Sequence, residues 1–313
     1  MTVGITFNNG KKAALITDSR GSLFGRQSDV FDKMSTFATA NYHGAMFGSG
    51  NGNTIQGVFS GLDSSKSSTI DDFVSSVRSL QQGIENPNYA RWLEAMKSEA
   101  MAKATLIPKG PKREQFINQE HVKIMQLFDQ YKADPNNRAQ LIAVLFDKAK
   151  EKIRHFDIGS YTYNELFGNN AQIGSGMDGA NMYFVTRLQG LDPSKLSPAE
   201  LVFHVVNAYS LATVNQGVGG TPKLVIVDEK EPKVIGPQRT RALVNLSGGY
   251  LTDGSKKLGY KRGTEIADEV LHSKNPNYKR LAKQLGVRID TLTTMAVPYS
   301  IWQERANAPN NKK

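Results

Sequence analysis

The chain has 313 residues, no cysteine and a formal net charge of +10 at pH 7. The missing cysteines exclude disulfides, a thiolate metal site and a cysteine nucleophile. No run approaches 18 uncharged apolar residues, so no hydrophobic membrane helix is expected, and the N-terminus lacks the basic and apolar pattern of a signal region. With 39% hydrophobic and 22% charged residues the composition is typical of a globular protein, which we expect in the cytoplasm.

The positive charge is concentrated towards the C-terminus. Residues 238–313 contain 14 Lys and Arg against 6 Asp and Glu, which accounts for +8 of the total of +10. We therefore expect two parts with different roles, a domain over residues 1–237 and a basic, mostly helical extension over residues 238–313.

The N-terminus carries a candidate nucleophile. The small second residue permits removal of Met1, which would leave Thr2 with a hydroxyl and a free α-amine on the same residue. The ordinary pKa of an α-amine is roughly 7.7–8.0, so part of it is uncharged at neutral pH and can accept the proton of the hydroxyl. This is the threonine form of N-terminal nucleophilic catalysis.

The residues that follow predict short strands and turns. Residues 3–7 and 13–17 read as a β-hairpin around the turn Asn-Asn-Gly, and the second strand leads into Thr-Asp-Ser-Arg-Gly-Ser over 17–22. Two further strands are predicted, one beginning near Lys33 and one ending in Gly-Ser-Gly over 48–50.

This pattern resembles the N-terminal part of proteasome β-type subunits and of their bacterial relative, the peptidase of the HslUV system. The resemblance covers roughly residues 2–236 and is interrupted by an insert at about 84–137. It implies an α+β fold, a four-layer α/β/β/α sandwich of the N-terminal-nucleophile hydrolase kind, with a small helical C-terminal extension.

The resemblance also implies roles for individual residues. Thr2 would be the nucleophile, Asp18 would orient Lys33, and the Lys33 ammonium would disfavour a second positive charge on the Thr2 amine. The backbone N–H of Gly48 would stabilise the oxyanion, since glycine permits close approach. Further residues implied in the site are Ser22 for the substrate backbone, Met46 in the first specificity pocket, Ser175 in relaying the proton, and Arg20 and Asn215 in support.

Two positions leave alternatives open. Ser175 lies in a second Gly-Ser-Gly, where it could cap a helix instead of relaying a proton, or do both. Proteasome subunits commonly carry an Asp and a Ser where this chain has Asn215 and Val218. Since Asn carries no charge and Val cannot form a hydrogen bond, these two replacements argue against full proteasome-like activity.

The insert at 84–137 is polar and helical in pattern, and it follows helices predicted at 53–62 and 69–82. Its apolar stripes favour helix packing; the alternative is that the insert narrows access to Thr2 or docks a partner. Beyond it the sequence predicts strands at 139–146, 152–156 and 223–228 and an amphipathic helix around 201–209.

The basic extension has a spacing typical of a helix-turn-helix. Helices are predicted at 264–272, 278–285 and 289–296. Such a tail could bind nucleic acid through its positive field, but the third helix begins without Lys or Arg at its base-reading positions, which favours docking to a protein partner.

Together these features predict a threonine-type endopeptidase, assembled into a proteasome-like homo-oligomeric ring, that hydrolyses peptides or unfolded proteins with an ATP-dependent unfoldase as a candidate partner. No cofactor, metal or membrane contact is expected, and His204 is read as a packed or surface residue rather than a ligand. Three alternatives stay open: an amidase or transpeptidase with the same nucleophile, a nucleic-acid-associated binding protein, and an inactive structural ring subunit.

Overall fold

Two antiparallel sheets of five strands each form the centre of the described part of the molecule. The computed structural model describes residues 3–19, 21–23, 26–28, 32–134, 136–213, 221–252 and 260–285. The first sheet, in the order β10-β1-β2-β11-β12, consists of Asn170–Gly174, Val3–Asn8, Ala13–Thr17, Lys223–Val227 and Lys233–Ile235. The second sheet, in the order β5-β6-β7-β8-β9, consists of Met34–Ala38, Tyr42–Gly50, Ala139–Asp147, Lys152–Ile158 and Tyr163–Leu166. A short hairpin of β3 (Gly21–Leu23) and β4 (Arg26–Ser28) stands apart from both.

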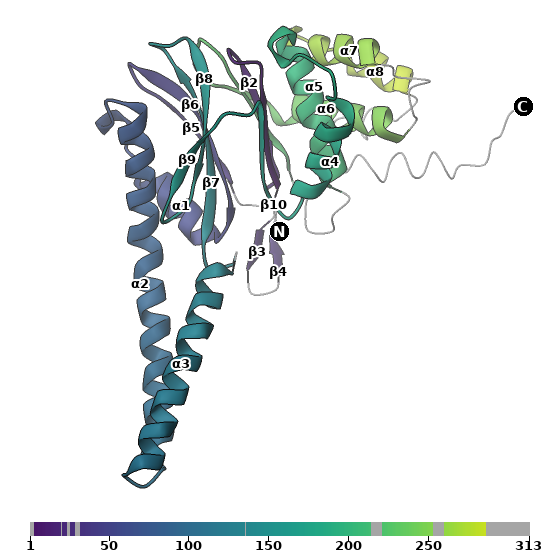
Figure 1. Ribbon diagram of the computed structural model, residues 1–313. Helices are drawn as coiled ribbons and strands as arrows, with labels where there is room; N and C mark the ends of the chain where they lie inside the picture. Colours follow the sequence, from purple (N-terminus) through teal and green to yellow (C-terminus); the bar gives the residue numbers. More distant parts are fainter. Residues whose placement is uncertain are drawn as a thin grey trace, which may run out of the picture.

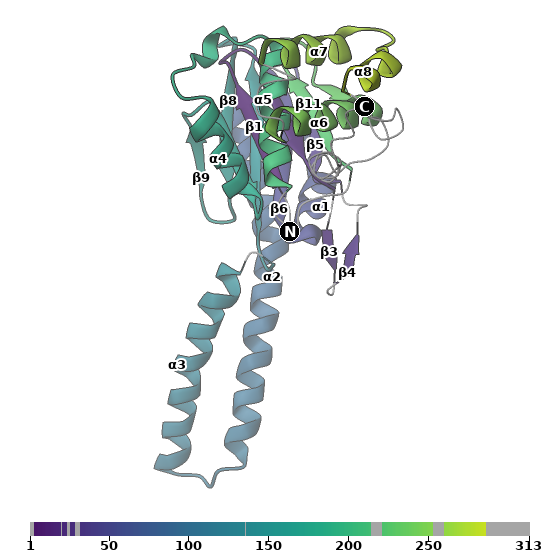
Figure 2. The same cartoon turned by 90° about the vertical axis from the view of Figure 1, so that its right-hand side faces the viewer.

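The two sheets pack face to face (Figures 1 and 2). Successive residues of a strand point to opposite faces, so strands buried on both sides carry apolar residues at nearly every position. Leu15, Phe47, Val144 and Val225 lie in the cluster between the sheets, and none of the four is more than 2% exposed.

Helices cover the outer face of each sheet (Figure 1). On the second sheet, α1 (Gly52–Gly61) and the first part of α2 (Ile70–Thr105) bury Ile55, Phe73 and Val77. On the first sheet lie α4 (Met177–Arg187) and α5 (Pro198–Ala212). The predicted four-layer α/β/β/α sandwich is therefore confirmed.

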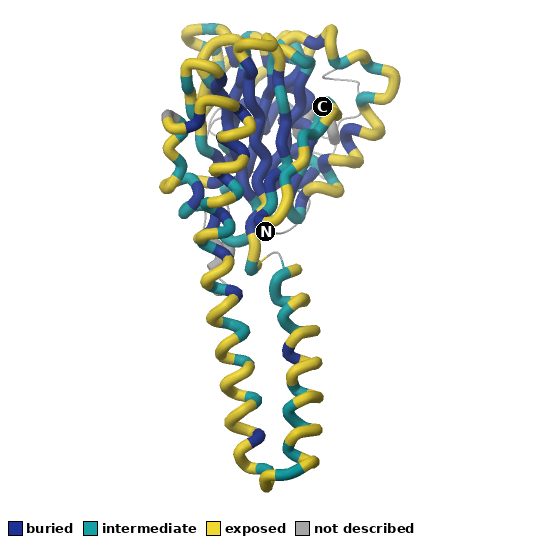
Figure 3. Tube along the Cα trace, turned by 60° about the vertical axis from the view of Figure 1, so that its left-hand side comes forward, coloured by how far each residue is buried: buried dark blue, intermediate teal, exposed yellow. Residues whose placement is uncertain are grey.

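The insert is a helical hairpin that projects away from the sandwich (Figures 1 and 3). The helix that we expected to end near Gln82 continues through Pro87 to Thr105, and α3 (Pro111–Ala133) returns beside it. Trp92 stacks on Tyr131 and Phe128, with ring centroids 4.7 and 5.8 Å apart. The apolar stripes of the insert therefore pack against each other, while most other side chains of the hairpin are exposed (Figure 3).

Two C-terminal helices, α6 and α7, pack on α5, and α8 joins the same buried cluster (Figure 2). Leu243 of α6, Val270 of α7 and Leu281 of α8 belong to the same buried cluster as α5. As a result 12 of the 15 residues of α5 are buried, so the prediction of a helix with one apolar face was wrong. The three helices are α6 (Pro237–Thr252), α7 (Tyr260–His272) and α8 (Tyr278–Leu285). The sequence predicted α7 and α8 but not α6. The helix expected at 289–296 lies outside the described residues.

Candidate active site

A buried ion pair joins the two sheets at one end of the sandwich. Asp18 directly follows β2 of the first sheet, and Lys33 directly precedes β5 of the second. Lys33 Nζ lies 3.1 Å from Asp18 Oδ1, and the two side chains are 6% and 0% exposed. The same carboxylate oxygen accepts a hydrogen bond from Val3 N at 3.0 Å. The structure thus brings Asp18 and Lys33 together at the start of β1.

Strand pairing explains this position. Gly4 lies opposite Thr17 in the β1–β2 ladder, which places Asp18, the residue after β2, beside Val3. The Thr17 hydroxyl and the Asp18 N–H both donate to Val3 O, at 3.0 and 3.3 Å. The backbone of Val3 is therefore held through both its N–H and its carbonyl. Because desolvating two charges costs about as much as their attraction returns, such a pair is weak evidence for a purely stabilising role.

Several residues of the predicted site lie beyond what the structure describes. Thr2, Arg20 and Asn215 lie outside the described residues, and the side chain of Ser22 is not described. Val3 N is the amide nitrogen of the peptide bond to Thr2. The described part of the site thus ends one covalent bond short of Thr2.

Gly48 and Met46 both lie on β6, and Gly48 contacts the backbone of Lys33. The Gly48 N–H donates to Lys33 O at 3.0 Å, and a Cβ at Gly48 would lie 2.8 Å from side-chain atoms of Ile55 and Leu141. Packing alone therefore accounts for the glycine. Met46 is completely buried in the cluster beneath α1 and α2. The oxyanion role of Gly48 and the pocket role of Met46 stay predictions.

Ser175 follows β10 at the same end of the first sheet. Gly174, the residue before it, pairs with Val3 across the β1–β10 ladder. The N-cap of α4 is Gly176, without a side-chain cap bond, so the alternative in which Ser175 caps the helix was wrong. Its proton-relay role stays a prediction.

A second ion pair, which the sequence did not indicate, lies next to the first. Lys223 Nζ, at the start of β11, is 2.9 and 2.8 Å from the two carboxylate oxygens of Asp32 and 2.7 Å from Met34 O. Asp32 is the neighbour of Lys33, whereas Lys223 is 191 residues further along the chain. No spacing rule connects positions so far apart.

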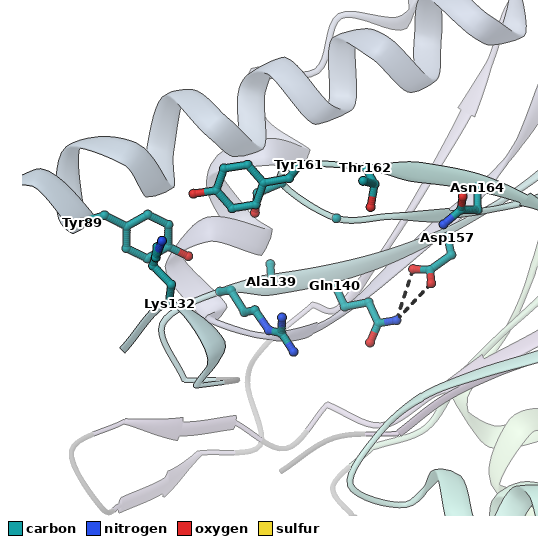
Figure 4. A pocket seen from close by; sticks show the side chains of 11 residues that line it. Tyr89, Lys132, Ala139, Gln140, Asp157, Tyr161, Thr162 and Asn164 are labelled. Carbon is teal, nitrogen blue, oxygen red and sulfur yellow. Dashed lines mark hydrogen bonds between the residues drawn. The ribbon is translucent and has the colours of Figure 1, made fainter. Parts of the chain in front are cut away.

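A separate hollow of about 230 Å³ lies where the hairpin joins the second sheet (Figure 4). Tyr89, Gln140, Asp157 and Tyr161 contribute to its wall, and Gln140 Nε2 donates to both oxygens of Asp157 at 3.1 and 3.3 Å. None of the predicted site residues lines it.

Within the described ranges, no three His, Asp or Glu side chains are grouped to hold a metal ion. Nor is any described helix both long and apolar enough to cross a membrane.

With this geometry in view, the chain was compared with known proteins. No family model matches it, and no curated protein matches it. Solved structures do. Anbu (ancestral beta-subunit) from Yersinia bercovieri is 13% identical, with a TM-score of 0.50 over 74% of this chain and 86% of that one. Anbu from Hyphomicrobium sp. strain MC1 is 14% identical, with a TM-score of 0.50 over 80% and 95%. Anbu from Pseudomonas aeruginosa is 12% identical, with a TM-score of 0.51 over 74% and 85%.

The chain has the fold of the Anbu proteins. This is a proteasome-like α/β/β/α sandwich, and at 12–14% identity the likeness concerns the fold alone. The identification with proteasome β-type subunits or the HslUV peptidase was wrong, because no family model matches and the similar structures described above are Anbu proteins. The motifs behind it, a β1–β2 hairpin followed by Asp18 and a strand entered at Lys33, belong to strands that build the two sheets. They indicate the fold and do not distinguish families that share it.

Proposed function

We propose that the chain is an N-terminal-nucleophile hydrolase of the threonine type that cleaves peptide bonds. The observation that supports this function best is the buried Asp18–Lys33 pair, which contacts the Val3 N–H next to Thr2. Well-packed apolar side chains would serve the stability of the sandwich at least as well as this pair. A lysine and a carboxylate beside a candidate N-terminal nucleophile are instead what amide hydrolysis needs.

The proposed mechanism uses both functional groups of Thr2. After Met1 is removed, the neutral α-amine accepts the proton of Thr2 Oγ while Oγ attacks the scissile carbonyl. The Lys33 ammonium keeps the amine neutral by charge repulsion, and Asp18 keeps Lys33 in place. The Gly48 N–H, which donates a hydrogen bond to Lys33 O, also donates one to the oxyanion. The amine then returns the proton to the leaving amine, and water that it activates hydrolyses the acyl-enzyme.

For substrate and assembly we propose peptides or unfolded proteins and a homo-oligomer. The Pseudomonas aeruginosa structure is described as a helical assembly of the Anbu complex, and its TM-score of 0.51 relates the two folds. Light scattering after size exclusion tests the assembly: a mass of several subunits is expected, and a monomer at all concentrations would contradict it.

Intact mass of the protein, with and without a β-lactone that acylates N-terminal threonines, tests the chemistry. We expect loss of Met1 and a single adduct on Thr2, absent from Thr2→Val. Lys33→Ala should lower the rate of adduct formation by about 100-fold or more, the usual scale of a proton-transfer contribution. Lys11→Ala, at an exposed lysine of the β1–β2 turn, is the matched control and should react normally.

The other outcomes separate the alternatives. Retained Met1, or no adduct on a trimmed chain, would contradict the proposal and favour an inactive structural subunit. An adduct that an added amine intercepts in preference to water would replace hydrolysis by transpeptidation.

A further inference from the structure

A pocket of about 320 Å³ lies directly beside the Asp18–Lys33 pair, on the side of β2 away from β1. The ends of β2 and β12, the start of β11 and the residues just before β5 form its wall, so both sheets contribute. Its volume is at the lower end of the roughly 300–1,000 Å³ that is usual for ligand pockets.

The charged groups of this pocket are already paired. Lys223 directs its ammonium at Asp32 and at Met34 O, with three contacts between 2.7 and 2.9 Å. An ammonium has three N–H groups, so these contacts use its donor capacity. Asp18 Oδ1 accepts from Val3 N and Lys33 Nζ. A ligand would thus gain little from these charges.

The uncharged part of the wall combines Thr17, Ser19 and Thr221 with four apolar residues, of which Val234 and Pro237 are exposed. Pro222, Ile235 and Pro237 line it together with Val234. Val234 pairs with Val225 in the β11–β12 ladder, and cross-strand partners share a face of the sheet. Val225 is completely buried between the sheets, whereas Val234, on the edge strand, is 50% exposed. The apolar surface between the sheets therefore continues into the open edge beside Lys33.

We propose that this pocket, which Met46 does not line, receives an apolar side chain of the peptide substrate close to the bond that is cleaved, in addition to the first specificity pocket predicted at Met46. The assignment rests on the proposed function, because Asp18 and Lys33 form part of the pocket wall. A branched aliphatic or aromatic side chain fits a pocket whose charges are satisfied, and a carboxylate or ammonium would lose hydration there without gaining a partner. The proposal makes Val234 a specificity-determining residue.

Peptide binding tests the proposal without requiring turnover. The protein carries Thr2→Val, and the probes are fluorescein-labelled tetrapeptides with one position changed in turn among Leu, Phe, Ala and Glu. By fluorescence anisotropy we expect Leu or Phe at one position to bind about tenfold more tightly than Ala, as burial of one apolar side chain allows, and Glu to bind no better than Ala. Val234→Asp should abolish this preference.

Val185→Asp, at an exposed valine of α4 outside the pocket, is the matched control and should keep the preference. Val234→Thr retains the shape and β-branching of valine; it should reduce the preference and carries the test if the Asp variant fails to fold. An unchanged preference in a folded Val234 variant overturns the pocket assignment, and so does a tight-binding Glu peptide. Failure of the proposed function has a different signature, the absence of a Thr2 adduct in the unmodified protein.

Discussion

Glu85 is the buried carboxyl group that fixes the helical hairpin to the sandwich. It is 0% exposed, although it lies on α2 close to where the helix leaves the second sheet. One carboxyl oxygen accepts from Ala139 N at 2.7 Å and from Gln81 Nε2 at 3.3 Å. The other accepts from the Tyr89 hydroxyl at 3.2 Å and from the Ser160 hydroxyl. Four donors from α2, β7 and the turn between β8 and β9 therefore converge on one side chain.

We predict that Glu85→Ala lowers the free energy of unfolding by about 3 kcal/mol. The Ala139 N–H would lose its acceptor while its residue stays 3% exposed, and an orphaned buried donor costs about 1–3 kcal/mol. The loss of the remaining hydrogen bonds adds about 1 kcal/mol, because Gln81 and Tyr89 also donate to the carbonyls of Ala139 and Asn137. Glu85→Gln keeps one carbonyl oxygen for the Ala139 N–H and should cost about half as much.

Urea denaturation followed by circular dichroism measures this difference. Glu94→Ala is the control, since Glu94 is an exposed residue of the same helix and its removal should change stability by less than about 0.5 kcal/mol. Alanine favours the helix at both positions, so helix propensity cannot produce the expected loss. A decrease below about 1 kcal/mol for Glu85→Ala, with an unchanged m-value, would refute the reasoning.

Two further predictions concern pH and close packing. Burial lowers the pKa of both His155 and His204 to about 4, so the unfolded chain, with an ordinary His pKa near 6.5, takes up protons first as the pH falls. Stability should therefore be complete above about pH 6.5 and decrease towards pH 4 by up to about 3 kcal/mol per histidine; a urea midpoint unchanged from pH 7.5 to 5 would contradict this. Gly263→Ala should lower the melting temperature, because the new Cβ would lie 2.5 Å from the Phe203 ring, whereas Gly83→Ala, which meets nothing within 4 Å, should raise it by gaining helix propensity. Equal shifts of the same sign in differential scanning calorimetry would exclude the proposed contact.

The extent to which the sequence predicted the fold depended on how local each signal was. Strands at 13–17 and 139–146 were predicted closely, because their apolar runs are bounded by turn residues within a few positions. The helix that became α2 was expected to end near Gln82, but the structure continues it to Thr105. It even passes through Pro87, although proline usually interrupts a helix. The burial of α5 on all sides could not be predicted, because the helices that cover it come from much later in the chain.

In the candidate site, too, the contacts between residues far apart in the sequence were the ones that the sequence did not predict. The contact of Asp18 with Lys33 was predicted through a resemblance, and strand pairing explains it. The ion pair of Asp32 with Lys223 was missed, since an Asp and a Lys 191 residues apart look like two separate surface charges. Glu85 was missed for a related reason: a glutamate in a polar helical segment is usually exposed, and only the neighbouring strands bury it.

The packing of α6 and α7 on α5, with α8 in the same buried cluster, also has a consequence for the timing of folding during synthesis. The buried cluster of the first sheet includes Ala282, so it cannot close until roughly 70 residues have been translated after the end of α5. At about 5–20 residues per second, the apolar residues of α5 stay uncovered for roughly 4 to 14 s after they are made. A chain whose synthesis stops in this interval would leave the apolar residues of α5 without cover, so chaperone binding should concentrate on nascent chains of this length.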